Sequence, residues 1–355
     1  MAERIAYIVT HKRFAVSSPI VSQVARLLGA YGFSVTVLDS DSDGTQPAGR
    51  KGFSVDPSAE IVVVLGGDGT ILRAVEIVKG TQVPVIGINL GHIGFLAEFE
   101  SFEISKAIKR IAEKDYTIEK RMIADVELWL PHRPEPVHDW ALNDTVVYHG
   151  ANSPMIQVGI TVDDVAVSSF GCDGVIASTP TGSTAYAFSA GGPIIWPGVK
   201  ALELLPIAAH ALFTRPLIAG SESSFGIHVL EVQGDDAVMT CDGRRVHTVP
   251  ADSRITVRES ADTLRLARLS GALFADRLVT KFNLPVVGWR EQAERRIENG
   301  GPLQDTVGGS RASGTEKFIH FPHYLGTGGF NQAINDGLSE MDQYRMFNDF
   351  RADED

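Results

Sequence analysis

The sequence predicts an α/β N-terminal domain with an open sheet, followed by a C-terminal domain of mostly antiparallel β structure. Two observations lead to this fold class. As far as about residue 96, apolar runs alternate with stretches of helical spacing, which is typical of a parallel sheet covered by helices. From about Arg121 onward, short alternating runs are separated by turn residues. We therefore expect the α/β domain to span residues 1–120 and the β-rich domain to span residues 121–271.

In the first domain, each element follows from its local pattern. Ser18–Gly29 has helical spacing and stops at a glycine, and Ile71–Val75 begins a second helix. Ile61–Leu65 is a continuous apolar run, as in a buried parallel strand. Residues 39–58 are polar and rich in Gly, Ser and Asp, so we expect a loop there. Strands are expected at 5–10, 33–38, 61–65 and 83–89.

In the second domain, the expected strands are shorter and more regular in spacing. Turn residues separate them, which favours hairpins over helical crossovers. They are expected at 124–130, 141–147, 156–162, 226–232, 237–240 and 254–257.

The composition is that of a globular enzyme. The 355 residues are 44% hydrophobic, enough for a full core, and the net charge of −12 argues against a nucleic-acid partner. No apolar stretch has the length of a membrane span and the N-terminus lacks the layout of a signal peptide, so we expect no membrane partner and a cytoplasmic location. Cys172 and Cys241 are expected to be reduced and non-catalytic, and no metal site built from the protein alone is expected.

A glycine–aspartate turn, Gly66 to Thr70, lies where the strand 61–65 ends and a helix begins. Free N–H groups at a helix N-terminus bind anions, and glycines let phosphate oxygens approach the backbone. Asp68 would repel a phosphate unless a metal ion or a transferable proton is involved, which makes it a candidate base or metal-linked group. The alternative is that Asp68-Gly69 is an ordinary turn dipeptide.

A second small-residue loop runs from Ser178 to Pro193 and is dense in hydroxyl side chains and glycines. Its hydroxyls can hydrogen-bond a polar ligand, and its glycines allow close approach of the backbone. Taken alone, the loop is equally consistent with an ordinary surface loop.

Together with Leu142-Asn143-Asp144 and Asp173-Gly174, the two loops resemble the NAD kinase family, over about Ile5 to Trp289. The resemblance implies phosphorylation of the 2′-hydroxyl of the adenosine ribose of NAD to give NADP. It implies ATP or polyphosphate as the donor, with Mg²⁺ or another divalent cation. It also implies a homo-oligomer, a dimer or tetramer, because relatives complete the pocket from a neighbouring subunit.

The resemblance assigns roles to individual residues. Asp68 is the expected base, and Asn143 and Asp144 are expected to hold NAD through its adenine and ribose. Arg73 is either a phosphate contact or a solvated helix residue. The expected phosphate contacts are Gly67, Gly69, Thr70 and Arg73. The rest of the expected NAD pocket comprises Asp173, Thr181, Ser183, Thr184, Ala185, Tyr186, Ala187, Phe188 and Ser189.

Two further positions have open interpretations. Arg244 follows Asp242-Gly243 and is either a phosphate contact or part of a surface turn. His210 lies where relatives place a pocket histidine, although a buried structural histidine is the stronger expectation. The resemblance also implies that residues 272–290 return to the first domain. Residues 291–355 form an acidic extension that the motifs do not explain.

Two alternatives to an NAD kinase stay open at this point. A lipid kinase acting on a diacylglycerol-like alcohol would use the same glycine–aspartate turn, but it leaves Thr179 to Pro193 unexplained. A non-catalytic NAD-binding regulator would use both loops, but it gains nothing from the carboxylate of Asp68 beside phosphate.

Overall fold

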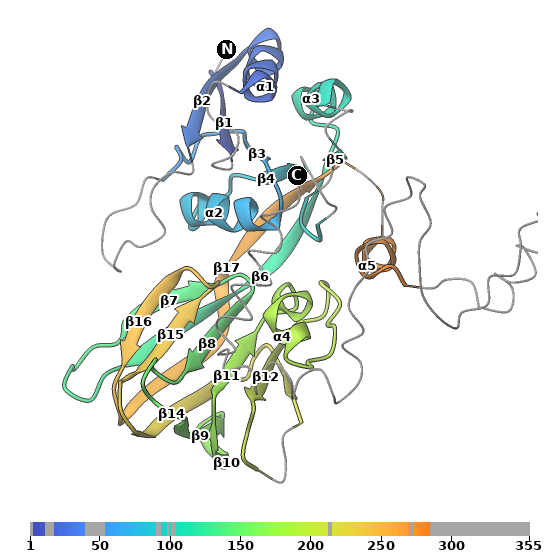
Figure 1. Cartoon of the computed structure of the whole chain (residues 1–355). Coiled ribbons are helices and arrows are strands. Elements are labelled where there is room, and N and C mark those ends of the chain that lie inside the picture. The colour runs from blue at the N-terminus through green and yellow to red at the C-terminus, as the bar shows by residue number, and fades with distance from the viewer. Residues whose placement is uncertain are drawn as a thin grey trace, which may run out of the picture. The chain divides into compact units, whose positions relative to one another are not determined.

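Parallel strands form the first part of the molecule (Figure 1). They pair in the order β2, β1, β3, β4, and every pair in this set is parallel. Their bounds are Arg4–Thr10 for β1, Phe33–Asp39 for β2, Ile61–Leu65 for β3 and Val85–Asn89 for β4. All four strands predicted from the sequence in this part are confirmed.

The computed structural model describes residues 3–10, 18–39, 54–89, 94–97, 99–100, 104–211, 215–269, 271 and 273–284. Most of the predicted loop 39–58, and the whole predicted extension 291–355, lie outside the described residues.

Helices cover both faces of the parallel strands. Helices α1 (Pro19–Ala30) and α3 (Ile104–Ala112) pack on one face, and α2 (Asp68–Val78) packs on the other. The strands serve both layers because successive side chains alternate: Ile8 faces α1 and α3, whereas Val9 faces α2. Both faces of the strands are therefore buried, which explains their continuous apolar sequences.

The second part contains a separate antiparallel sheet of six strands, in the order β13, β12, β11, β8, β15, β16. Their bounds are Asp144–Tyr148 for β8, Gly174–Ser178 for β11, Ala201–Ile207 for β12, Leu217–Gly220 for β13, Ala237–Cys241 for β15 and Arg245–Val249 for β16. The predicted antiparallel character of this part is confirmed.

Two long strands connect the parallel strands to the second part. Strands β6 (Thr117–Trp129) and β17 (Ser253–Arg268) pair with each other, and β17 also pairs with β4 through Leu266 and Val85. The same eleven-stranded sheet continues into β14, β9 and β10, with β7 beside β6 and the short β5 beside β4. Bounds are Phe99–Glu100 for β5, Val137–Ala141 for β7, Ile156–Val162 for β9, Val165–Cys172 for β10 and Phe225–Val232 for β14.

The main core of the second part lies between the two sheets. It joins Val126, Ile160 and Phe225 of the large sheet to Val147 and Leu204 of the smaller one. Three short helices complete the described chain: a 3₁₀ turn η2 (Gly182–Thr184), α4 (Tyr186–Ser189) and α5 (Phe274–Phe282). Among the described residues, no helix combines the length and apolar character needed to span a bilayer.

Several sequence predictions differ from the structure in extent. The region predicted as a single strand at 141–147 contains the end of β7 and most of β8, and Leu142 and Asn143 separate these two strands. The strand predicted at 254–257 is the start of β17, which continues to Arg268 past a register shift between Glu259 and Thr263. Strands β10 to β13 and β16 were not predicted, because their runs are short or interrupted by Gly, Ser and Pro.

Candidate functional site

The glycine–aspartate turn joins β3 to α2. Gly67 is the N-cap of α2, and Asp68 is its first residue, so the turn lies at the positive end of the helix dipole. A side chain at Gly66 would overlap the hydroxyl of Thr70, which is itself buried. Gly69 is exposed, and Gly67 and Arg73 are half-buried. Part of the turn is therefore accessible at the start of the helix.

The carboxylate of Asp68 is held by a neighbouring loop. It accepts hydrogen bonds from the N–H groups of Phe95 at 2.8 Å and Leu96 at 3.0 Å. A Cβ at Gly94 would overlap this carboxylate, so a larger residue there would displace the side chain of Asp68. Each carboxylate oxygen has more than one lone pair, so these two bonds fix Asp68 and leave acceptor capacity for a substrate proton.

Buried arginines support the loop that holds Asp68. Arg268 donates to the carbonyl of Leu96 at 2.8 Å, and Arg277 donates to the carbonyl of Ala97 at 2.6 Å. Arg121 and Arg268 share the carboxylate of Glu119, at 2.9 and 2.5 Å. Burial lowers the pKa of Arg121 to about 10, although Glu119 opposes this shift.

Arg121 also connects this cluster to the hydroxyl-rich loop. Its guanidinium lies 3.4 Å from the hydroxyl of Thr181. A continuous set of polar contacts therefore runs from Thr181 to Asp68, through Arg121, Glu119, Arg268 and Leu96.

The hydroxyl-rich loop packs directly on Leu142 and Asn143. Thr179 donates its hydroxyl to the carbonyl of Leu142 at 2.5 Å and its N–H to the carbonyl of Asn143 at 2.9 Å. A Cβ at Gly182 would overlap the carbonyl oxygen of Asn143, so this glycine is required by close backbone approach. The structure thus brings together two motifs that are far apart in the sequence.

The predicted pocket residues differ in how their side chains are used. The hydroxyl of Ser183 is fully buried, lies 2.8 Å from the carbonyl of Pro180 and accepts the N–H of Ile195 at 2.9 Å, so this hydroxyl serves the loop itself. Thr184 bonds back to the carbonyl of Thr181 at 3.2 Å. The others vary in exposure: Thr181 and Ala187 are buried, Ala185 and Tyr186 are half-buried, and Phe188 and Ser189 are exposed.

Asp144 is almost fully buried, and its pKa is raised to about 8 by burial and by the nearby Asp242. Asp242 accepts N–H groups from Leu142 at 3.0 Å and Asn143 at 2.7 Å, and burial raises its pKa as well. Asp242 therefore shapes the backbone that carries both predicted NAD contacts.

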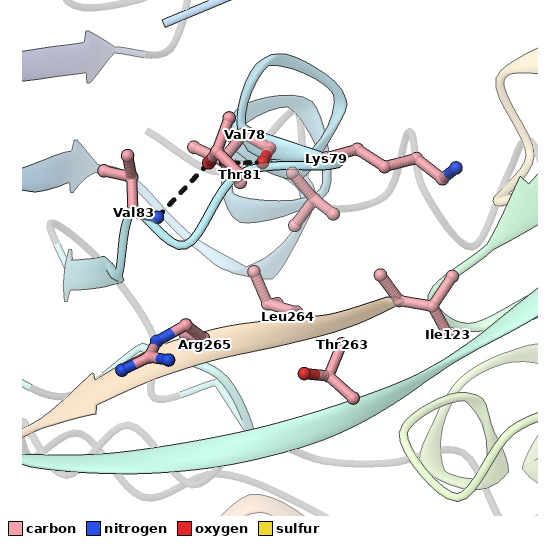
Figure 2. Close-up of a pocket in the computed structure, with 9 residues that line it drawn as sticks. Val78, Lys79, Thr81, Val83, Ile123, Thr263, Leu264 and Arg265 are labelled. Carbon is pink, nitrogen blue, oxygen red and sulfur yellow. Dashed lines mark hydrogen bonds between the residues drawn. The ribbon is translucent and has the colours of Figure 1, made fainter. Parts of the chain in front are cut away.

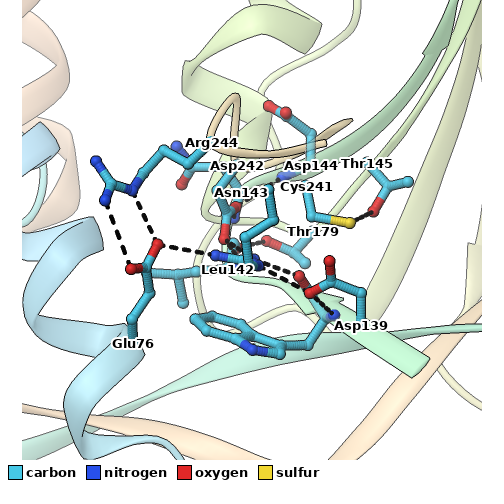
Figure 3. A network of polar contacts seen from close by, with 12 residues as sticks. Glu76, Asp139, Leu142, Asn143, Asp144, Thr145, Thr179, Cys241, Asp242 and Arg244 are labelled. Carbon is cyan, nitrogen blue, oxygen red and sulfur yellow. Dashed lines mark hydrogen bonds and ion pairs between the residues drawn. The ribbon is translucent and has the colours of Figure 1, made fainter. Parts of the chain in front are cut away.

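A polar network joins this backbone to α2, as Figure 3 shows. Arg244 pairs with Glu76 of α2 at 2.8 Å, and Arg245 reaches Glu76 at 3.1 Å and Asp242 at 3.1 Å. Arg245 also pairs with Asp139, which bonds His247 at 2.6 Å. The structure places Arg244 in an ion pair within the protein, and its predicted phosphate contact stays a prediction.

Asp173 lies half-buried beside His149 and His210. Burial raises the pKa of Asp173, and the two histidines oppose the shift. The expectation of a buried structural histidine at position 210 is wrong, because His210 is exposed and is held through its backbone N–H to the carbonyl of Gly171. Cys172 and Cys241 are both unpaired and buried, and burial raises the pKa of Cys172 to about 12.

A small cavity lies away from these motifs, between the C-terminal end of α2 and β17 (Figure 2). Its volume is about 10 Å³, and its lining includes Val78, Val83 and Leu264. This is room for about one water molecule, so it holds no nucleotide. No group of three or more potential metal-ligating His, Cys, Asp or Glu side chains occurs in the described part of the chain.

Comparison with known families agrees with the motifs and their placement. The model of the ATP-NAD kinase N-terminal domain matches residues 7–116, and that of the ATP-NAD kinase C-terminal domain matches residues 142–269. The chain belongs to the NAD kinase family. An NAD kinase from Bifidobacterium longum subsp. infantis is 56% identical over 302 residues, which cover 84% of this chain and 88% of that protein. The chain is accordingly an NAD kinase family enzyme, and it phosphorylates NAD to NADP.

Solved structures of NAD kinases have the same fold. A yeast NADH kinase complexed with NADH has a TM-score of 0.70, at 21% identity, and covers 81% of this chain and 89% of that one. An Archaeoglobus fulgidus NAD kinase in complex with ATP has a TM-score of 0.60, at 25% identity, and covers 77% and 98%. Membership of the NAD kinase family argues against the lipid kinase and the non-catalytic regulator.

Sequence reasoning missed the charged residues that support the site. Glu76, Arg121, Arg268 and Arg277 belong to no local motif, and their partners lie far away in the sequence. A charged residue at a position predicted to face the core could have indicated these pairs. Arginine is almost never buried unless it is paired, so such a residue implies a buried partner. Arg121 shows it: it precedes the buried run Met122–Ala124 and is itself buried.

Proposed function

We propose that Asp68 is the general base for phosphoryl transfer from ATP to the 2′-hydroxyl of the adenosine ribose of NAD. The observation that carries this proposal is the placement of Asp68 at the start of α2, with its carboxylate fixed by two N–H groups. A base must be held within reach of the proton that it accepts. ATP as the donor is supported by the family and by the ATP complex of the Archaeoglobus fulgidus relative.

In the proposed reaction, the ribose 2′-oxygen attacks the γ-phosphorus of ATP. The bond from that phosphorus to the β,γ-bridging oxygen breaks, ADP leaves, and the proton of the 2′-hydroxyl passes to Asp68. Gly67 and Gly69 offer the N-terminal backbone of α2 to phosphate oxygens, so that the positive end of the helix dipole lies where negative charge develops. Thr70, whose N–H donates to the carbonyl of Gly67 at 3.0 Å, is proposed as a further contact of the same turn. Arg73, one turn further on, is proposed as a phosphate contact.

Mg²⁺ is proposed to enter with the phosphoryl donor. The carboxylate of Asp68 is an oxygen ligand of the kind that Mg²⁺ prefers, and it lies in the same turn as the proposed phosphate contacts. When bound, the ion supplies charge neutralisation on the transferred group. The protein's own contribution is to orient the two substrates and hold the base.

The acceptor site is proposed to lie around Asn143 and Asp144, beside the loop that carries Thr181 and Tyr186. An amide can read an adenine edge. Because burial raises the pKa of Asp144 to about 8, its carboxyl is mostly protonated near pH 7 and can donate one hydrogen bond to a ribose hydroxyl and accept another. The remaining proposed contacts are Asp173, Ser183, Thr184, Ala185, Ala187, Phe188 and Ser189. Use of polyphosphate, a homo-oligomer and a cytoplasmic location stay predictions from the sequence.

The test replaces the base. We expect Asp68→Asn to lower kcat for NADP formation by about 10²–10⁴-fold, since general base catalysis contributes about that much. The dissociation constant for NAD should change by less than threefold. NADP formation is measured with ATP–Mg²⁺ and, in parallel, with polyphosphate, so that the donor is identified as well.

Asp163→Asn is the matched control, because Asp163 lies in an exposed turn and caps the N–H of Ser224 at 2.8 Å. This variant should keep the activity of the original chain. An Asp68→Asn enzyme with more than a tenth of the original kcat would rule out Asp68 as the base.

A further inference from the structure

An ion-pair bridge spans the space between α2 and the turn that joins β15 to β16. We call Glu76, Arg244, Arg245 and Asp242 the Glu76 bridge (Figure 3). Glu76 belongs to the helix that begins with Asp68, and the other three residues follow β15. The bridge is therefore a direct contact between the element that carries the proposed base and the sheet that carries the proposed NAD contacts.

On the side of α2, the bridge holds a rigid element. Glu76 lies eight positions after Asp68 on one α-helix, which corresponds to about 12 Å at 1.5 Å per residue. Because the helix transmits displacement along its axis, a constraint on Glu76 also limits the movement of Asp68. The cavity between this helix and β17 is only about 10 Å³, so the helix rests on a close-packed base.

On the side of the second sheet, the bridge ends on backbone amides. Asp242 receives the guanidinium of Arg245 at 3.1 Å and the N–H groups of Leu142 and Asn143 at 3.0 and 2.7 Å. Asp242 itself has φ 54°, in the left-handed region, which turns the chain so that Arg244 and Arg245 face α2. The backbone of Asn143 is thus linked to Glu76 through only two side chains, those of Asp242 and Arg245.

Arg245 is held by contacts with Trp140 and Asp139 as well as by the bridge. It stacks 4.1 Å from the ring centroid of Trp140, donates to the carbonyl of Trp140 and pairs with Asp139 at 2.8 Å. Burial alone would lower the pKa of Arg245, but the carboxylates of Asp242 and Asp139 outweigh it and raise the pKa. The guanidinium of Arg245 therefore stays charged. Because the group is planar and pairs with both Glu76 and Asp242, it can hold these two carboxylates at a fixed distance from each other.

We infer that the Glu76 bridge positions Asp68 relative to Asn143 and Asp144, and that Glu76, Arg244 and Arg245 are positioning residues for the transfer. This inference rests on the roles proposed above for Asp68 and Asn143. The reacting atoms must be placed to well under 1 Å for fast transfer. In the proposed reaction ATP is bound at the start of α2 and NAD at Asn143 and Asp144, so the two substrates lie on opposite sides of the bridge. Loss of the bridge should therefore lower the rate of transfer more than it weakens the binding of either substrate.

The test is Glu76→Gln, which keeps the side-chain shape and removes the charge. We expect kcat for NADP formation to fall about tenfold, with dissociation constants for NAD and ATP within twofold of the original values. Arg244→Gln should lower kcat less, because Glu76 keeps its ion pair with Arg245 in that variant. The double variant should be no worse than Glu76→Gln alone, because Glu76→Gln already removes the partner of Arg244.

Glu127→Gln is the matched control. Glu127 pairs with Arg258 at 2.7 Å and is as buried as a member of the bridge, but it lies outside the site. The control should keep its kcat. If Glu76→Gln unfolds the chain, Arg244→Gln decides the question, since Arg244 lies in a turn.

The inference is overturned if both single variants keep more than half of the original kcat, or if their effects add in the double variant. It is also overturned if binding weakens as much as kcat falls. These outcomes differ from failure of the proposed base, which would show as persistent activity in Asp68→Asn while the Glu76 variants still behave as expected.

Discussion

Three buried polar side chains lie in a row across the smaller sheet. Ser178 of β11 is directly opposite Asp144 of β8 and Glu203 of β12, so all three project from the same face of the sheet. Glu203 is fully buried, and within the described part of the chain both of its carboxylate oxygens lack a hydrogen-bond partner. A Cβ at Gly192 would come within 2.5 Å of this carboxylate, so the backbone that follows α4 covers it directly.

Glu203 leads to a prediction about stability. Burial raises its pKa from the ordinary 4.5 to about 7. The folded protein therefore holds this proton more tightly than the unfolded chain, and the stabilisation from Glu203 is complete below about pH 4.5 and is lost as the pH rises to about 7. We expect Glu203→Gln to raise the melting temperature at pH 8 by about 2–4 °C.

The measurement is thermal unfolding of both proteins between pH 5 and pH 8. The difference in melting temperature should shrink toward pH 5, where the original carboxyl is protonated. Glu222→Gln, at a position in an exposed turn, serves as the control and should show no such trend. A difference that is equal at both pH values would contradict the prediction.

Single residues of the site were predictable where a local motif marked them. Asp68, Asn143 and Asp144 lie in short motifs with a chemical meaning of their own, and the structure places each at a strand or helix end. The role of Ser183 was harder to predict, because only the folded loop shows that its hydroxyl is used by Pro180 and Ile195. Glu203 gave no signal, since nothing nearby in the sequence says which side of β12 faces α4.

At the scale of elements, α5 contacts the loop that holds Asp68, through Phe95, and the hydroxyl-rich loop, through Phe188. Phe274 and Phe282 each lie 5.7 Å from the ring of Phe95, and Phe282 lies 4.5 Å from the ring of Phe188. Phe274 also contacts Trp196 at 4.8 Å. Because Phe95 donates one of the N–H groups that fix Asp68, this helix is a support for the proposed base.

Arg277 provides the test of this support. Its guanidinium donates to the carbonyl of Ala97 at 2.6 Å in a buried setting. We expect Arg277→Gln to speed hydrogen exchange at the amides of Phe95 and Leu96 by about tenfold and to lower kcat in the same direction, because the loop would open more often. Exchange is followed by mass spectrometry on the peptide that contains residues 94–97.

Arg258→Gln is the control for this change, since Arg258 is exposed and pairs with Glu127 away from the loop. Its exchange at residues 94–97 should match the original protein. Unchanged exchange in Arg277→Gln would mean that the loop does not depend on α5.

Elements were predictable in proportion to the regularity of their sequences. β3 and β4 are continuous apolar runs, and α1 buries Val21, Val24 and Leu28 at helical spacing with Pro19 at its start. β17 was predicted too short because Glu259, Ser260 and Asp262 interrupt its alternation at the register shift. The break between β7 and β8 depends on Asp242, which accepts the N–H groups there and lies almost a hundred positions away.

At the scale of the whole molecule, the site uses residues as far along the chain as α5, and the family models end at residue 269. We therefore expect a chain that ends at residue 290 to retain NADP formation within twofold. A chain that ends at residue 271 lacks Phe274, Arg277 and Phe282 and should be inactive. Activity of the two purified chains, with melting temperatures alongside, checks both statements, and loss of activity in the longer one would show that residues 291–355 contribute to catalysis.

The fold class was predictable at this scale, but the connection between the two parts was not. Alternating elements and then short strands correctly indicate an α/β part and an antiparallel part. Nothing in the local patterns shows that β6 and β17 extend the parallel sheet into the second part, because pairing between strands more than a hundred residues apart has no local signature.

The placement of β17 has a consequence for how the chain is made. Leu264 and Leu266 belong to the core beneath α2, and Ala267 and Leu269 belong to the core beneath α1 and α3. These residues are synthesised long after the parallel strands that they complete. At a synthesis rate of about 5–20 residues per second, the parallel strands leave the ribosome many seconds before β17. During this time β4 lacks its pairing with β17. We therefore expect an interval during synthesis in which the parallel strands, which all lie within the first 89 residues, are accessible to chaperones. We also expect activity to begin only after β17 has been translated.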